Sequence, residues 1–188
     1  MKTFILSLTL ASILFAACNN TESTNEASGT TSSAGTSDQN STEDNTPATD
    51  IITSYLKVKN ALANDNDIEA ASAATELAKA FNNVDKAALN AEQSQVFTDL
   101  EADAIEHAEH IASNAGNLVH QREHFETLSE EVYELVKVTG AGQKLYYTNC
   151  PMYNNNKGAN WLSESKEVKN PYFGQEILTC GSVKEELN

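Results

Sequence analysis

The chain has 188 residues and a formal net charge of −15 at pH 7, and no basic patch stands out in it. This charge argues against nucleic acid as a partner, because binding to phosphates relies on clustered lysine and arginine side chains. Once an N-terminal signal and a polar tether are set aside, about 140 residues remain. That length suits one domain with its own hydrophobic core.

The first residues have the pattern of a bacterial export signal. Lys2 precedes an apolar stretch from Phe4 to Leu14, and small residues then lead to Cys18. A cysteine in this position resembles the lipobox of bacterial lipoproteins, in which the cysteine is lipidated and becomes the mature N-terminus. We therefore expect residues 1–17 to be a cleaved lipoprotein signal peptide and Cys18 to be the lipidation site. The alternative is an ordinary secretory signal in which the cysteine occurs by chance.

This interpretation predicts where the protein works. Lipid on Cys18 anchors the protein to a bacterial membrane, and the domain then belongs to the cell envelope and faces the periplasm or the exterior. Residues 18–49 comprise the lipidated cysteine and a tether of small and polar residues without Lys or Arg. Such a composition buries too little apolar area to offset the entropy of ordering, so we expect the tether to be disordered.

Residues 50–142 have apolar side chains at the spacing typical of helices, interrupted by short polar turns. Because short connections make neighbouring helices antiparallel, we expect a mainly α fold built on a four-helix up-down bundle. The first helix is expected to begin at a Thr49 or Asp50 cap and the second at an Asp67 cap. The third is expected to span residues 90–113 and the fourth residues 118–138.

The remaining residues, 143–188, are rich in aromatic side chains but have no helical period. Runs such as Leu145-Tyr146-Tyr147 and Pro171-Tyr172-Phe173 alternate with asparagine-rich turn signals. A disordered tail would not carry so many large apolar rings. We therefore expect an irregular, aromatic-rich C-terminal segment of the same domain, packed on the bundle.

All four histidines fall in the third and fourth predicted helices. His107 and His110 precede the turn between these helices, and His120 and His124 follow it. When the hairpin closes, His107 and His124 lie at one height, and His110 and His120 lie at another height nearer the turn. Neutral imidazole is a common ligand of zinc, copper, iron and nickel, so all four are candidate metal ligands.

Acidic residues on the same two helices are candidate partners for these imidazoles. Asp103, Glu106 and Glu123 lie within about one helical turn of a histidine and can orient a ring or ligate an ion directly. Spacing along a helix predicts height better than rotation about the helix axis. An alternative therefore stays open, in which the histidines lie on opposite flanks and are separately solvated.

Two cysteines, Cys150 and Cys180, lie in the C-terminal segment. In an oxidising compartment such a pair usually forms a disulfide. The alternative is metal ligation, because an extended Cys150-Pro151-Met152 run aims a thiolate and a thioether in the same direction. Soft sulfur ligands select Cu(I), so Cys150, Met152 and Cys180 are also candidate metal ligands.

The sequence contains no convincing motif of a common enzyme class. A glycine-rich phosphate loop, H-E-x-x-H and G-x-S-x-G are all missing. A redox enzyme that uses Cys150 and Cys180 ranks last, because these residues lack the C-x-x-C spacing that tunes such thiols. We therefore expect a protein without catalytic activity.

Several short runs, taken together, resemble one bacterial family. They are Tyr55-Leu56-Lys57-Val58-Lys59-Asn60-Ala61-Leu62, Gln121-Arg122-Glu123-His124-Phe125, Leu128-Ser129, Leu135-Val136-Lys137, Cys150-Pro151-Met152, Trp161-Leu162-Ser163, Asn170-Pro171-Tyr172-Phe173-Gly174 and Cys180-Gly181. Over roughly residues 50–183 the chain resembles the bacterial domain of unknown function numbered 3347. That family occurs as exported lipoproteins and as fusions to the periplasmic adaptors of copper/silver-type efflux systems, so the resemblance implies a metal-handling role.

These observations give two hypotheses about function. In the first, the chain is a lipid-anchored extracytoplasmic metal-binding protein that buffers copper or delivers it to an efflux or maturation partner, with zinc as the second choice of ion. In the alternative, it is a non-catalytic protein-interaction module with a structural Cys150–Cys180 disulfide. The expected partners are the membrane, through the lipid, and heavy-metal efflux components.

Overall fold

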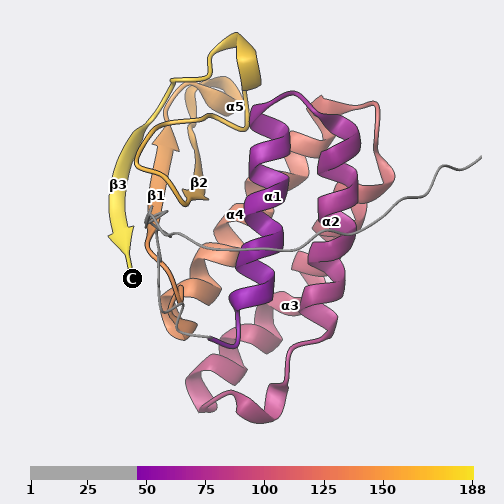
Figure 1. The fold of residues 1–188 in the computed structure, drawn as a ribbon, viewed down its shortest axis with the longest axis vertical. Coiled ribbons are helices and arrows are strands. Elements are labelled where there is room, and N and C mark those ends of the chain that lie inside the picture. Colours follow the sequence, from indigo (N-terminus) through magenta and orange to yellow (C-terminus); the bar gives the residue numbers. More distant parts are fainter. Residues whose placement is uncertain (1–45) are drawn as a thin grey trace, which may run out of the picture. The chain divides into compact units, whose positions relative to one another are not determined.

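The computed structural model describes residues 46–188, so the expected signal peptide, Cys18 and most of the expected tether lie outside the described residues. Four long helices come first, and three strands with short helical turns follow (Figure 1). The helical elements are α1 (Thr49–Ala63), α2 (Asp67–Asn82), η1 (Lys86–Ala88), α3 (Ala91–Ser113), α4 (Leu118–Thr139), α5 (Tyr153–Asn156) and η2 (Gly174–Glu176). The strands are β1 (Leu145–Cys150), β2 (Ala159–Ser163) and β3 (Ser182–Leu187).

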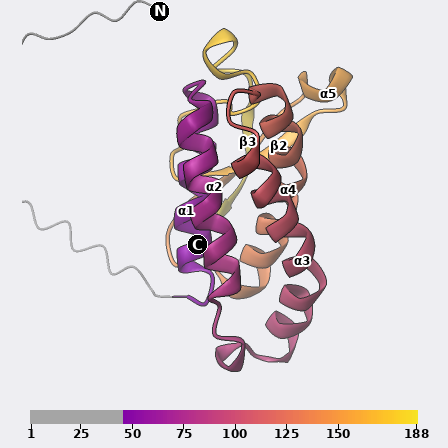
Figure 2. The same cartoon turned by 90° about the vertical axis from the view of Figure 1, so that its right-hand side faces the viewer.

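The four long helices form the expected bundle. In Figure 1, α1 and α2 lie in front of α3 and α4, and in both views consecutive helices lie side by side (Figure 2). Helix α3 turns one apolar face inward, and its five buried residues are Phe97, Leu100, Ala104, Ala108 and Ile111. Burial of a side chain the size of Phe or Leu stabilises a fold by about 1.5–3 kcal/mol, so these faces hold the bundle together. No helix within residues 46–188 is long and apolar enough to span a membrane.

Two predicted helix caps are wrong. Asn66, not Asp67, caps α2 by accepting a hydrogen bond from the Glu69 backbone N–H, and the Asp67 carboxylate instead accepts from the Gly116 backbone N–H across the bundle end. Helix α1 has Ala48 at its cap position and no side-chain cap. Ala48 is buried, so the folded part begins slightly before residue 50.

The C-terminal segment packs on the bundle as expected, but it is not irregular. It contains a three-stranded antiparallel sheet in the order β2-β1-β3, and Trp161 and Leu162 of β2 are fully buried. Strand β1 carries aromatic and β-branched residues that favour strands. Strand β3 reads Ser-Val-Lys-Glu-Glu-Leu, which has little strand propensity of its own, so its pairing with β1 decides its conformation.

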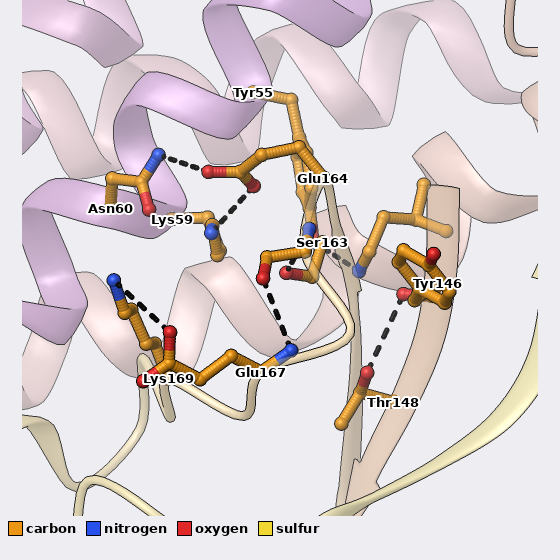
Figure 3. A network of polar contacts seen from close by, with 11 residues as sticks. Tyr55, Lys59, Asn60, Tyr146, Thr148, Ser163, Glu164, Glu167 and Lys169 are labelled. Atoms are coloured by element: carbon orange, nitrogen blue, oxygen red, sulfur yellow. Dashed lines mark hydrogen bonds and ion pairs between the residues drawn. The ribbon is translucent and has the colours of Figure 1, made fainter. Parts of the chain in front are cut away.

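A buried lysine joins α1 to the sheet (Figure 3). The side chain of Lys59 is only 1% exposed, and its Nζ lies 2.7 Å from Glu164 Oε2, just after β2. Asn60 donates to the other oxygen of the same carboxylate over 2.9 Å. Burial lowers the pKa of the Lys59 amine, even with Glu164 beside it. The pair therefore fixes one orientation of the sheet against the bundle.

Arg122, the only arginine of the chain, ties three segments to α4. Its guanidinium donates to the backbone carbonyls of Leu62 at 2.9 Å and Pro171 at 2.8 Å, and it pairs with the Asp65 carboxylate. The α1–α2 turn and the loop before η2 are thus held beside the start of α4. This end of the bundle also contains the α3–α4 turn, on whose two sides the histidines lie.

Candidate metal centre

The four histidines come together on the α3–α4 hairpin. Gly116 takes a φ of +91° in the turn, a conformation that favours glycine, and Asn117 caps α4 by accepting from the His120 backbone N–H. The tight turn sets the register of the two helices. His107 consequently faces His124, and His110 lies near His120, as the predicted heights required.

The imidazole rings touch one another in a continuous cluster. His110 and His124 are stacked with ring centroids 4.3 Å apart, and His120 meets His124 edge-on at 4.6 Å. The Nδ1 atoms of His107 and His124 lie 2.9 Å apart, which is hydrogen-bond distance. The alternative in which the histidines lie on opposite flanks is therefore wrong.

Three of these side chains form the best ligand set. His110, His120 and His124 each offer one ring nitrogen, and these nitrogens all lie within 4.8 Å of one another. Nitrogens bound to one tetrahedral zinc ion lie about 3.3 Å apart, given Zn–N bonds of about 2.0–2.1 Å. Small rotations of half-exposed rings cover the difference. The three imidazoles can therefore hold one ion and leave a coordination position for water or another ligand.

Glu131 lies on the same face of α4 and is the residue that the sequence analysis missed. It follows His124 by seven residues, or about two helical turns, and this i, i+7 spacing was the available signal. Glu131 Oε1 lies 3.8 Å from His107 Nε2, and Oε2 is buried without a hydrogen-bond partner. A buried acceptor of this kind is rare in folded proteins and needs an explanation.

Burial and neighbouring charges shift the pKa values of Glu131, His107 and His124 in the direction that favours their neutral forms. Burial raises the pKa of Glu131 to about 7, and the nearby charge of Asp103 adds to the effect. Burial also lowers the pKa of His107 and His124, and for His124 the neighbouring His110 lowers it further. Lowered histidine pKa values favour neutral rings, which is the form that binds metal.

The predicted acidic partners surround the cluster at different distances. Glu123 Oε2 lies 3.3 Å from His120 Nδ1, and Glu106 Oε1 lies 3.8 Å from His110 Nε2. Asp103 acts through its charge, which adds to the raised pKa of Glu131 and offsets part of the lowering of the pKa of His107 by burial. These carboxylates make the surroundings of the imidazoles attractive to a cation.

The sulfur atoms are not part of this centre, which corrects the ligand set expected from sequence. Cys150 and Cys180 form a disulfide with a Cα–Cα distance of 5.6 Å, so neither offers the thiolate that metal ligation requires. Met152 is 50% exposed and follows Cys150 by two residues, just before α5. Met152 was a ligand candidate only together with a thiolate from Cys150, and the disulfide removes that thiolate.

Comparison with known proteins shows one family whose model matches the part of the chain that contains the histidines. The model of the family described as "Protein of unknown function (DUF3347)" matches residues 51–144, which is half of the chain and covers nearly all of α1 and the whole of α2 to α4. The match ends before β1, so the disulfide and the sheet lie outside it. The chain matches no curated protein and no solved structure. By the match across its helical bundle, the chain belongs to the DUF3347 family.

Proposed function

We propose that this protein binds a divalent transition-metal ion through His110, His120 and His124. The observation that carries the proposal is the convergence of three ring nitrogens within 4.8 Å on one hairpin. The proposed role is binding without turnover. Copper is the expected ion and zinc is the second choice.

The donor atoms favour the divalent oxidation state of copper. Imidazole suits copper, zinc and nickel, whereas soft thiolate and thioether ligands select Cu(I). With Cys150 and Cys180 in a disulfide, the cluster offers nitrogen and carboxylate oxygen only. Such a set favours Cu²⁺, and the Irving–Williams order places Cu²⁺ above Zn²⁺ at the same ligands.

The exposure of the ligands supports buffering or delivery rather than a permanent structural ion. The side chains of His110 and His120 are 44% and 35% exposed. An ion held there stays within reach of a second protein. In the full proposal, lipid on Cys18 holds the domain at a bacterial membrane in the cell envelope, and a heavy-metal efflux or maturation component accepts the copper.

Titration calorimetry tests the proposal directly. Purified protein is titrated with Cu²⁺ and Zn²⁺, and we expect one ion per chain with a Kd below 1 μM for Cu²⁺. The His124→Ala variant should lose at least tenfold in affinity. Glu134→Ala, which removes an exposed carboxylate elsewhere on α4, is the matched control and should bind as the wild type does. Wild-type protein that binds neither ion at micromolar concentration would rule the function out.

One observation favours the second candidate, a non-catalytic protein-interaction module. The Cys150–Cys180 disulfide that it requires is present, and it closes the end of the sheet. The calorimetry separates the two functions, because the interaction module predicts no specific metal binding and no change in melting temperature with Cu²⁺ or Zn²⁺.

A further inference from the structure

We infer that Glu131, His107 and His124 form a hydrogen-bonded chain that fixes the tautomer of His124 and aims its Nε2 atom at the ion. This inference rests on the proposed metal binding and assigns His107, a ligand candidate by sequence, to a positioning role. The ion is then held by three imidazoles, and a buried carboxylate supports one of them from behind.

The first link is the contact between the two Nδ1 atoms. His107 Nδ1 and His124 Nδ1 lie 2.9 Å apart, so one nitrogen carries a proton and donates the hydrogen bond that the other accepts. A neutral imidazole carries one N–H only. The direction of this bond therefore decides which nitrogen of His124 has a free lone pair.

The second link sets that direction. His107 Nε2 faces Glu131, whose Oε1 is 3.8 Å away and whose Oε2 is buried without a partner. An ionised carboxylate only accepts hydrogen bonds, and a small rotation of the His107 ring brings Nε2–H within reach of it. His107 then has its proton on Nε2, its Nδ1 accepts from His124 Nδ1–H, and His124 Nε2 is left free.

The third link is the packing of the His124 ring. His110 stacks on one side of it with an interplanar angle of 12°, and His120 meets it edge-on at 78°. The ligand set of three nitrogens closes without His107. Metal-bound histidines commonly donate their second N–H to a carboxylate, and here His107 stands between that carboxylate and the ligand.

Nitrogen NMR of the metal-free protein at pH 8 tests the chain without any metal. We expect the proton of His107 on Nε2 and that of His124 on Nδ1. The reverse assignment would overturn the inference. Because this measurement needs no ion, it decides the hydrogen-bond chain even if the proposed metal binding fails.

Copper binding by variants tests the positioning role. Glu131→Ala should weaken Cu²⁺ binding about 10- to 100-fold, the usual effect of removing such a support. Glu131→Gln should recover most of the affinity, because its amide oxygen still accepts. Glu134→Ala is the matched control on the exposed face of α4. Equal affinities of Glu131→Ala and the wild type would overturn the positioning role.

Electron paramagnetic resonance of the Cu²⁺ complexes separates a positioning residue from a ligand. His107→Phe should lower the affinity but leave the number of coupled nitrogens unchanged, whereas His124→Ala should remove one. Loss of one nitrogen in His107→Phe would make His107 a ligand and overturn the inference. Circular dichroism melts establish whether each variant is folded. If a variant does not fold, the NMR assignment of the metal-free wild type still tests the hydrogen-bond chain.

Discussion

The imidazole rings of His110 and His124 are stacked across the α3–α4 hairpin, with their centroids 4.3 Å apart and their planes 12° from parallel. Two positive charges at this distance repel each other. The closeness of His110 therefore lowers the pKa of His124, in addition to the larger effect of burial. For the proposed metal binding this matters, because a ring that stays neutral keeps its lone pair available.

Replacing His110 by asparagine should raise the pKa of His124, since one of the charges that lower it is removed. Proton NMR of the His124 ring in the metal-free protein measures the change. The folded-state pKa of His124 is below its unfolded value of 6.5, so its contribution to stability is present above pH 6.5 and is lost as the pH falls. The variant should lose less stability than the wild type between pH 7 and pH 5.

Ser113→Ala is the control for this titration, because it changes a nearby uncharged side chain on α3. It should leave the pKa of His124 where it is in the wild type. If His110→Asn also leaves the pKa unmoved, the two rings do not interact in solution.

Glu131 should make the metal-free protein less stable as the pH rises. Its folded pKa of about 7 lies above the ordinary 4.5, so its contribution is fully present below about pH 4.5 and is lost as the pH rises through about 7. Glu131→Gln stays neutral and avoids this loss. At pH 8 the variant should gain up to about 3 kcal/mol over the wild type, relative to their difference at pH 5.

Urea unfolding at both pH values, in the presence of a chelator, measures this gain. Glu134→Gln neutralises an exposed carboxylate of the same helix and should show no comparable change. Identical pH profiles of wild type and Glu131→Gln would mean that Glu131 is ionised freely in the folded protein.

The disulfide should stabilise the fold without serving the metal centre. Its cysteines are separated by 30 residues, and closing a loop of that length is worth about 3–4 kcal/mol in the chain-entropy estimate. The double variant Cys150→Ser/Cys180→Ser should lose about this much stability in urea. Its affinity for Cu²⁺ should match that of the wild type, and a tenfold loss in the folded variant would return the sulfur atoms to the ligand set.

The Lys59–Glu164 pair should be costly to break from one side only. Glu164→Ala leaves an amine that is 1% exposed without its carboxylate, and we expect a loss of about 2–4 kcal/mol in urea unfolding. The double variant Lys59→Met/Glu164→Gln removes the charge as well and should stay within about 1 kcal/mol of the wild type.

The exposed pair of Lys57 and Glu76 provides the comparison, since both side chains are more than half exposed. Glu76→Ala should cost less than about 1 kcal/mol. Equal losses for Glu164→Ala and Glu76→Ala would show that water reaches Lys59.

The helices were predictable because their information is local. Apolar spacing and polar turns gave four helices close to their observed ends, and the position of each histidine relative to Gly116 gave its height along the hairpin. The caps were less predictable. Neighbouring Asn66 and Asp67 can both cap a helix, and the choice was made by the contact of Asp67 with the distant Gly116 backbone.

The sheet and the sulfur chemistry depended on contacts between distant residues. Strand β3 has little strand propensity of its own, and it is extended because β1 offers it a free edge. The sequence left Cys150 and Cys180 with two possible states, and the antiparallel pairing of β1 with β3, in which Asn149 lies opposite Ser182, brings Cys180 close enough for a disulfide.

The sequence by itself determined at what height along the hairpin each histidine lies, because helix rise and turn position are properties of the chain. Only the tertiary structure decided how the helices are rotated about their axes. That rotation depends on how whole apolar faces pack against each other, and it brings three imidazoles together and buries Glu131 beside His107.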